Sequence, residues 1–129
     1  MRRDALKAAA LAALLATATA FAAHRSVKTT ESETFADKTA SKKYDLPVPA
    51  GGGRVRLRMK GVVTAGEIRF RVLDSAGTEH QNARLTPDGP KPDRFDLETG
   101  EPRAAAGSWR LEVELKGATG RYEFTWTVE

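Results

Sequence analysis

The 129-residue sequence contains no cysteine and only two histidines, His24 and His80. Without cysteine there can be no disulfide bond, thiol nucleophile, thiolate zinc site or cysteine-linked lipid anchor. The histidines lack a His-x-His or His-x-x-x-His spacing, so they predict no metal site, and His80 is expected on the surface. No serine stands in a Gly-x-Ser-x-Gly turn. We therefore expect a chain without enzymatic activity and without a cofactor.

The first 23 residues contain a long apolar run, but most of it is alanine and large apolar side chains are few. Arg2, Arg3 and Lys7 precede an alanine-rich run over residues 8–23, which ends in small-residue cleavage patterns. This order is typical of a secretory signal peptide, predicted over residues 1–23, and it indicates a periplasmic or extracellular protein. The run is shorter than the roughly 20 residues that a bilayer span needs. The alternative is an uncleaved segment that anchors the chain in the inner membrane.

The residues Arg2-Arg3-Asp4-Ala5-Leu6-Lys7 resemble the twin-arginine export motif. In that motif, paired arginines are followed by two residues, a leucine and often a lysine. Ala5 departs from it, because a bulky aromatic residue is usual there. General secretion is the alternative route, since a positively charged start serves both.

The formal net charge of +4 is partly a property of this leader. Three cations and Asp4 contribute +2 before residue 24, so 4 − 2 leaves +2 for the remainder. Residues 24–40 are rich in Thr, Ser, Lys and Glu, and they are expected to form a linker that ends in a short strand near residues 33–37. The length predicts one domain, over residues 41–129.

Alternation of apolar and charged residues predicts β-strands through this domain. In residues 107–129, two alternating runs flank a Gly-Ala-Thr-Gly segment, which predicts a β-hairpin with Leu115 opposite Tyr122, Leu111 opposite Trp126 and Trp109 opposite Val128. Further strands are expected near residues 44–48, 54–60, 67–74, 79–85 and 94–97. Seven or eight short strands predict an all-β fold, a small antiparallel β-sandwich or jelly roll.

Two segments carry a resemblance to a known family. Residues 68–77 end in the turn Asp74-Ser75-Ala76-Gly77, and residues 106–113 lead into residues 120–126 with Trp109 in an alternating strand. They resemble the bacterial pre-peptidase C-terminal domain, and the same pattern is similar to the GOLD-type sandwich. The resemblance implies a secreted jelly-roll module, and it implies little about function.

Basic residues alternate with the apolar residues of two strands. They are Arg54, Arg56, Arg58, Lys60, Arg69 and Arg71. If the two strands were neighbours, like charges would face each other, which destabilises a sheet. Three alternatives follow: the strands lie in opposite sheets, acidic neighbours such as Glu112, Glu114 and Glu123 lie alongside, or the six form a face for an anionic ligand. The candidate partners are an anionic glycan, a lipid headgroup or an acidic protein. Nucleic acid is not expected, because the aromatic residues face the core.

Carboxylates suggest two further sites. Asp88, Asp93 and Asp96 could offer oxygen ligands to calcium, but Lys91 and Arg94 share their loop, and the alternative is ordinary turn chemistry. Glu112, Glu114 and Glu123 could serve glycoside hydrolysis, but carboxylates on the outward face of a strand are typical of a solvated surface.

The sequence therefore predicts an exported, non-catalytic β-sandwich module with a binding or accessory role in the bacterial envelope or outside the cell. One alternative is a structural subunit that associates by edge-strand pairing. A hydrolase is the disfavoured alternative.

Overall fold

The computed structural model describes residues 26–129, and within this range it contains five strands and no helix. The strands are β1 (Val27–Val48), β2 (Gly53–Leu73), β3 (Glu79–Leu85), β4 (Asp93–Ala104) and β5 (Gly107–Val128). Three of them, β1, β2 and β5, have 21 or 22 residues. A typical strand has about 5–6 residues, so each of these three is long enough to serve two layers.

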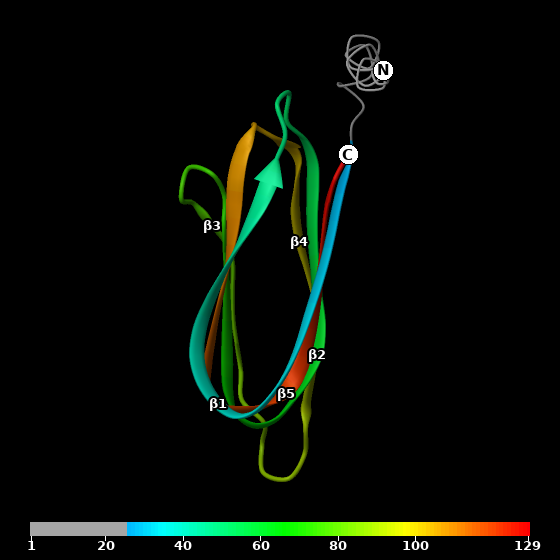
Figure 1. Ribbon diagram of the computed structural model, residues 1–129. Coiled ribbons are helices and arrows are strands. Elements are labelled where there is room, and N and C mark those ends of the chain that lie inside the picture. Colours follow the sequence, from blue (N-terminus) through cyan, green and yellow to red (C-terminus); the bar gives the residue numbers. More distant parts are fainter. Residues whose placement is uncertain (1–25) are drawn as a thin grey trace, which may run out of the picture.

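Each long strand bends near its middle. The register shifts between Phe35 and Ala40 in β1 and between Val63 and Glu67 in β2, and β5 bends opposite both. Figure 1 shows this turn at the end of the molecule away from the C-terminus. At the bend a Cβ atom on Gly66 would lie 2.1 Å from the carbonyl oxygen of Gly117, and both glycines have positive φ. The two backbones approach this closely because Gly66 has no side chain.

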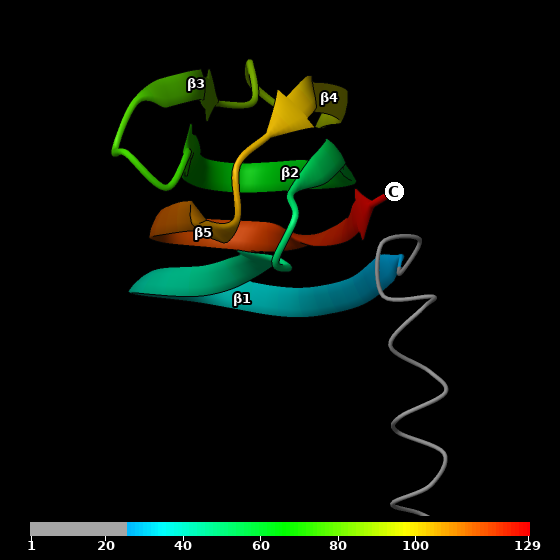
Figure 2. The ribbon, with the colours of Figure 1, turned by 90° about the horizontal axis from the view of Figure 1, so that it is seen from above.

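The bends divide the long strands between two antiparallel layers. In the first layer, residues 27–35 of β1 pair with residues 120–128 of β5, these pair with residues 55–63 of β2, and β2 pairs with β4. The second layer has the same order but ends in β3 instead of β4. It consists of residues 40–48 of β1, 107–116 of β5, 67–73 of β2 and 79–85 of β3. Figure 2, which looks down on the strands from above, shows the order from β1 through β5 and β2 to β3 and β4. The predicted small antiparallel β-sandwich is confirmed.

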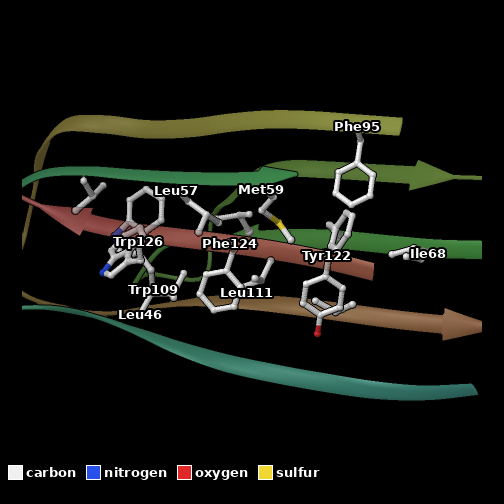
Figure 3. Close-up of a cluster of buried hydrophobic side chains, with 14 of the residues drawn as sticks. Leu46, Leu57, Met59, Ile68, Phe95, Trp109, Leu111, Tyr122, Phe124 and Trp126 are labelled. Atoms are coloured by element: carbon white, nitrogen blue, oxygen red, sulfur yellow. The ribbon is translucent and has the colours of Figure 1, made fainter. Parts of the chain in front are cut away.

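One apolar core fills the space between the layers. Every buried side chain among residues 26–129 is hydrophobic. Trp109 from the second layer and Trp126 from the first lie with their ring centroids 5.6 Å apart, at one end of the cluster in Figure 3. The indole N–H of Trp126 donates a 2.9 Å hydrogen bond to the carbonyl oxygen of Pro47, so its polar group is satisfied. The apolar positions of the alternating pattern therefore face inward, as predicted.

The hairpin predicted for residues 107–129 is wrong. These residues form the single strand β5, and its two halves pair with β1 and β2 rather than with each other. The Gly-Ala-Thr-Gly segment is the bend between layers, with positive φ at Gly117 and Gly120. Trp109 consequently contacts Trp126 across the core instead of standing opposite Val128 within a sheet.

The predicted linker over residues 24–40 also needs correction. From Val27 onward it is strand, the first-layer half of β1 and the bend that follows. The sandwich therefore begins near Val27 rather than at residue 41. The predicted signal peptide, residues 1–23, lies outside the described residues and stays a prediction. Between residues 26 and 129 no helix is long and apolar enough to cross a membrane.

Candidate functional site: a hollow on the outer face of the first layer

The six cationic residues predicted to bind a ligand lie on two opposite faces of the sandwich. The bend in β2 separates them, because the first half of this strand belongs to the first layer and the second half to the second. The first layer holds Arg54, Arg56, Arg58 and Lys60, and the second holds Arg69 and Arg71. Of the three alternatives, placement in opposite sheets is what the structure shows, and the six do not form one continuous face.

Acidic neighbours also accompany several of these cations. The ion pairs are Arg56 with Glu98 (3.3 Å), Arg58 with Asp96 (2.8 Å), Lys60 with Glu123 (3.7 Å), and Arg71 with both Glu79 (2.8 Å) and Glu112 (3.0 Å). Arg58 donates two hydrogen bonds to Asp96, and these lower the pKa of that carboxyl group. Exposed pairs of this kind add little to stability, but they neutralise the charge of the strand face.

A hollow of about 560 Å³ lies on the outer face of the first layer, near the bends. All four strand segments of that layer contribute to it. Its lining residues are Ser32, Glu33, Thr34, Lys60, Gly61, Arg94, Phe95, Asp96, Arg121, Tyr122 and Glu123. Of the six predicted cations, Lys60 is the member that lines it.

The register arranges the outward side chains of the hollow in two rows that cross the strands. The arginine row consists of Thr34, Arg121, Val62 and Arg94, which are direct partners from β1 to β4, and all of them except Val62 line the hollow. The carboxylate row consists of Ser32, Glu123, Lys60 and Asp96. Between them runs a third row, Glu33, Tyr122, Gly61 and Phe95. Because side chains alternate along a strand, the side chains of this middle row point into the sandwich. The backbone of the middle row forms the floor of the hollow.

The two rows differ in their charge balance. Arg94 and Arg121 are exposed, and neither forms an ion pair with any of residues 26–129. In the carboxylate row, by contrast, Glu123 is paired with Lys60, and Asp96 is paired with Arg58. Among residues 26–129, the arginine row therefore carries positive charge without an ion-pair partner, beside a row in which both carboxylates are paired.

Beneath the hollow, a polar cluster fixes the shape of β1. Glu33 forms ion pairs with Lys38 (3.0 Å) and with Lys42. Burial alone would raise the pKa of Glu33, but the hydrogen bonds from the two lysines outweigh it and the pKa is lowered. The hydroxyl groups of Tyr44 and Tyr122 lie 2.6 Å apart. Burial first, and then this hydrogen bond, raise the pKa of Tyr122, so its hydroxyl stays neutral.

His80 is not the free surface residue that the sequence predicted. It lies at a register shift between β2 and β3, where Val72 pairs with Gln81 and Leu73 pairs with Glu79. Such a bulge re-aims the extra side chain. The imidazole stacks on Trp109 at a centroid distance of 4.6 Å, and its Nε2 lies 2.9 Å from Oδ2 of Asp74. This contact closes the end of the sandwich opposite the bends.

The carboxylates considered for calcium are not gathered together. The backbone of Asp88 forms an isolated β-bridge with that of Lys91, before β4 begins at Asp93. Asp96 forms an ion pair with Arg58 on the outer face of the first layer. Within residues 26–129 no group of three His, Cys, Asp or Glu side chains is arranged to hold a metal ion.

The sequence pattern alone did not identify Arg94 and Arg121 as site residues. Arg121 lies in the segment interpreted as a hairpin, and Arg94 was an argument against calcium binding in its loop. Alternation showed that Arg121 points outward, but the pairing of both residues with Val62 depends on which strands are neighbours. β5 lies between β1 and β2 because it bends and continues through both layers. A hairpin would instead pair its two halves with each other.

No protein-family model and no curated protein matches the chain. Among solved structures, TmCBM61 in complex with β-1,4-galactotriose is similar over 81% of this chain and 87% of that chain, with 15% identity and a TM-score of 0.48. The carbohydrate binding module CBM6cm-2 from Cellvibrio mixtus lichenase 5A, in complex with cellotriose, is similar over 81% of this chain and 86% of that chain, with 10% identity and a TM-score of 0.42. A chain in the structure of infectious bursal disease virus Gx strain is similar over 81% of this chain and 32% of that chain, with 11% identity and a TM-score of 0.48. At this level of similarity the comparisons carry no argument about what the chain binds.

Proposed function

We propose that the chain is a non-catalytic binding module that holds an anionic glycan in the hollow of the first layer. The observation that carries the proposal is the arginine row, in which Arg94 of β4 and Arg121 of β5 project from either side of β2 into one hollow without an ion-pair partner among residues 26–129. Guanidinium groups bind carboxylate and sulfate oxygens with two parallel hydrogen bonds. Strands on a packed core hold such groups in place better than loops do.

The composition of the hollow favours a glycan among the three candidate partners. Sugar hydroxyl groups both donate and accept hydrogen bonds, and the hollow offers acceptors (Asp96, Glu123) beside donors (Ser32, Thr34, Lys60). A lipid headgroup site would be bordered by apolar side chains that enter the membrane, whereas the surrounding outward positions other than Val62 carry charges and hydroxyl groups. An acidic protein would need an interface with an apolar centre.

The ligand is proposed to be anionic because the hollow lacks an exposed aromatic platform. Its two aromatic lining residues, Phe95 and Tyr122, are 7% and 1% exposed. Stacking of a neutral sugar on an aromatic face therefore has no counterpart among these lining residues. Charge and hydrogen bonding remain as the means of recognition.

A hydrolase stays disfavoured although three carboxylates, Glu33, Asp96 and Glu123, line the hollow. A glycosidase needs one carboxylic acid whose pKa is raised, so that it can protonate the leaving group. Asp96 has the opposite property, because Arg58 lowers its pKa. We further propose, from the predicted leader, that the module acts in the periplasm or outside the cell.

Retention of the purified chain on immobilised heparin, eluted with a salt gradient, tests the proposal. The Arg94→Ala, Arg121→Ala double variant should bind at least tenfold more weakly, because each charge-assisted hydrogen bond contributes about 1.5–3 kcal/mol. Wild-type retention should fall steeply with salt. Arg103→Ala is the matched control, since Arg103 is an exposed arginine on the same strand as Arg94 but outside the hollow. Equal retention of the wild type and the double variant would contradict the proposal.

A further inference from the structure

The arginine row has a spacing that points to the charge pattern of its ligand, and the inference from it rests on the proposed function. Arg121 and Arg94 are separated by one intervening strand, because both pair directly with Val62 of β2. Neighbouring strands lie about 4.8 Å apart, so the two arginine backbones are about 10 Å apart across the sheet. That is close to the length of a disaccharide in an extended chain.

The residue between the arginines is uncharged. Val62 is partly buried and occupies the outward position between them on β2, next to Gly61, which lines the hollow. A hydrocarbon side chain can contact the C–H face of a sugar ring, but it offers nothing to a carboxylate or sulfate group. An anionic group placed over Val62 would lose water without gaining a partner. Across three adjacent strands, the row therefore presents a cation (Arg121 of β5), an apolar group (Val62 of β2) and a second cation (Arg94 of β4).

The carboxylate row supports the same alignment. It runs parallel to the arginine row, about 7 Å away, since two residues separate the rows along each strand. Glu123 stands beside Arg121, and Asp96 stands beside Arg94. Both carboxylates can accept hydrogen bonds from sugar hydroxyl groups, and their ion pairs with Lys60 and Arg58 leave this row without free positive charge to attract a second line of anions. One edge of the bound chain must therefore be anionic and the other hydroxylated.

From this geometry we propose that the module selects a polysaccharide that carries one acidic group on every second sugar and that lies across the strands, along the arginine row. The acidic groups of alternate sugars contact Arg121 and Arg94, and the neutral sugar between them lies over Val62. A polymer charged on every sugar is a poorer ligand, despite its higher charge density.

Two uronate polymers separate charge spacing from charge density. Hyaluronan oligosaccharides carry a carboxylate on alternate sugars, and oligogalacturonates of the same length carry one on every sugar. Isothermal titration calorimetry with the purified chain should give at least tenfold tighter binding of hyaluronan. Non-specific electrostatic attraction would give the reverse order, because it increases with charge density.

A variant at Val62 tests the role of the central position. Val62→Lys should improve oligogalacturonate binding at least tenfold and weaken hyaluronan binding. Thr127→Lys, which adds the same charge on the first layer outside the hollow, should leave the order unchanged. Since Val62 is partly buried, the wild-type comparison stands as the primary measurement if this variant is unstable.

The outcomes distinguish the inference from the proposed function. If both polymers bind through Arg94 and Arg121 and oligogalacturonate binds as tightly as hyaluronan or more tightly, the alternating-charge inference is overturned and the proposed function stands. If neither polymer binds, or if binding persists in the Arg94→Ala, Arg121→Ala double variant, the alternating-charge inference is overturned. The proposed function is overturned with it when the double variant is also retained on heparin as strongly as the wild type.

Discussion

Asp74 shows how one side chain can fix a turn and an aromatic ring at once. Its Oδ1 accepts hydrogen bonds from the backbone N–H groups of Ala76 and Thr78, both at 2.9 Å, and its Oδ2 holds the His80 ring against Trp109. The hydrogen bond with His80 is the main reason that the pKa of Asp74 is lowered, followed by the backbone hydrogen bonds. The carboxylate is therefore the form that the folded state prefers.

Replacing Asp74 with Asn should destabilise the fold in a pH-dependent way. A lowered pKa in the folded state stabilises it above the unfolded pKa of about 3.9, and this stabilisation is lost as the pH falls through the folded pKa. In urea unfolding followed by tryptophan fluorescence, Asp74→Asn should lower the midpoint at pH 7, and the difference should shrink below about pH 4. Asp88→Asn, in an exposed turn, serves as the control. A difference that persists unchanged at low pH would show that the charge of Asp74 is not responsible.

The bends in β1, β2 and β5 determine how the elements assemble, and they mark the limit of what the sequence pattern predicts. Alternation correctly identified the inward positions in β5, such as Trp109 and Trp126, because that property depends on neighbours along the chain. It could not distinguish a hairpin turn from a bend at Gly117, since both interrupt the alternation with glycine. Strand order, and with it the pairing of Arg94 and Arg121 with Val62, depends on contacts between distant segments, which one sequence does not reveal.

The linker interpretation of residues 24–40 failed for a related reason. This segment has few large apolar residues because its first-layer half forms the edge of the sandwich, where Glu31 and Glu33 occupy inward positions opposite Phe124 and Tyr122. Polar residues at inward positions conceal an edge strand from a search for apolar alternation. Glu33 is retained there by its ion pairs with Lys38, at the bend, and Lys42, beyond it.

Glu33→Gln should therefore weaken the fold at the bend of β1. The substitution leaves two lysines without their shared carboxylate, and because both lysines are partly exposed we expect a loss of about 1 kcal/mol in the free energy of unfolding. Chemical denaturation at pH 7 measures it. Glu31→Gln, at the neighbouring inward position on the same strand, should change the stability much less, because Glu31 forms no ion pair with the residues that the structure describes. Equal losses in the two variants would contradict a specific role for Glu33.

At the scale of the whole molecule, the sandwich protects one of its edges and leaves one outer face with a hollow. β1 is paired on one side, by β5, and its inward charges Glu31, Glu33 and Lys42 oppose the addition of another strand. Edge-strand pairing is therefore not favoured at β1. The hollow lies near the bends, and β1 begins with Val27 at the other end of the sandwich, where Val27 pairs with Val128 at the end of β5.

An NMR titration of the ¹⁵N-labelled chain with a hyaluronan octasaccharide tests the central claim most directly, because it reports on every backbone amide at once. The account predicts saturable shifts that are largest at residues 32–34, 60–62, 94–96 and 121–123. Shifts centred on Arg69 and Arg71 of the opposite face, or spread evenly over both faces, would contradict it.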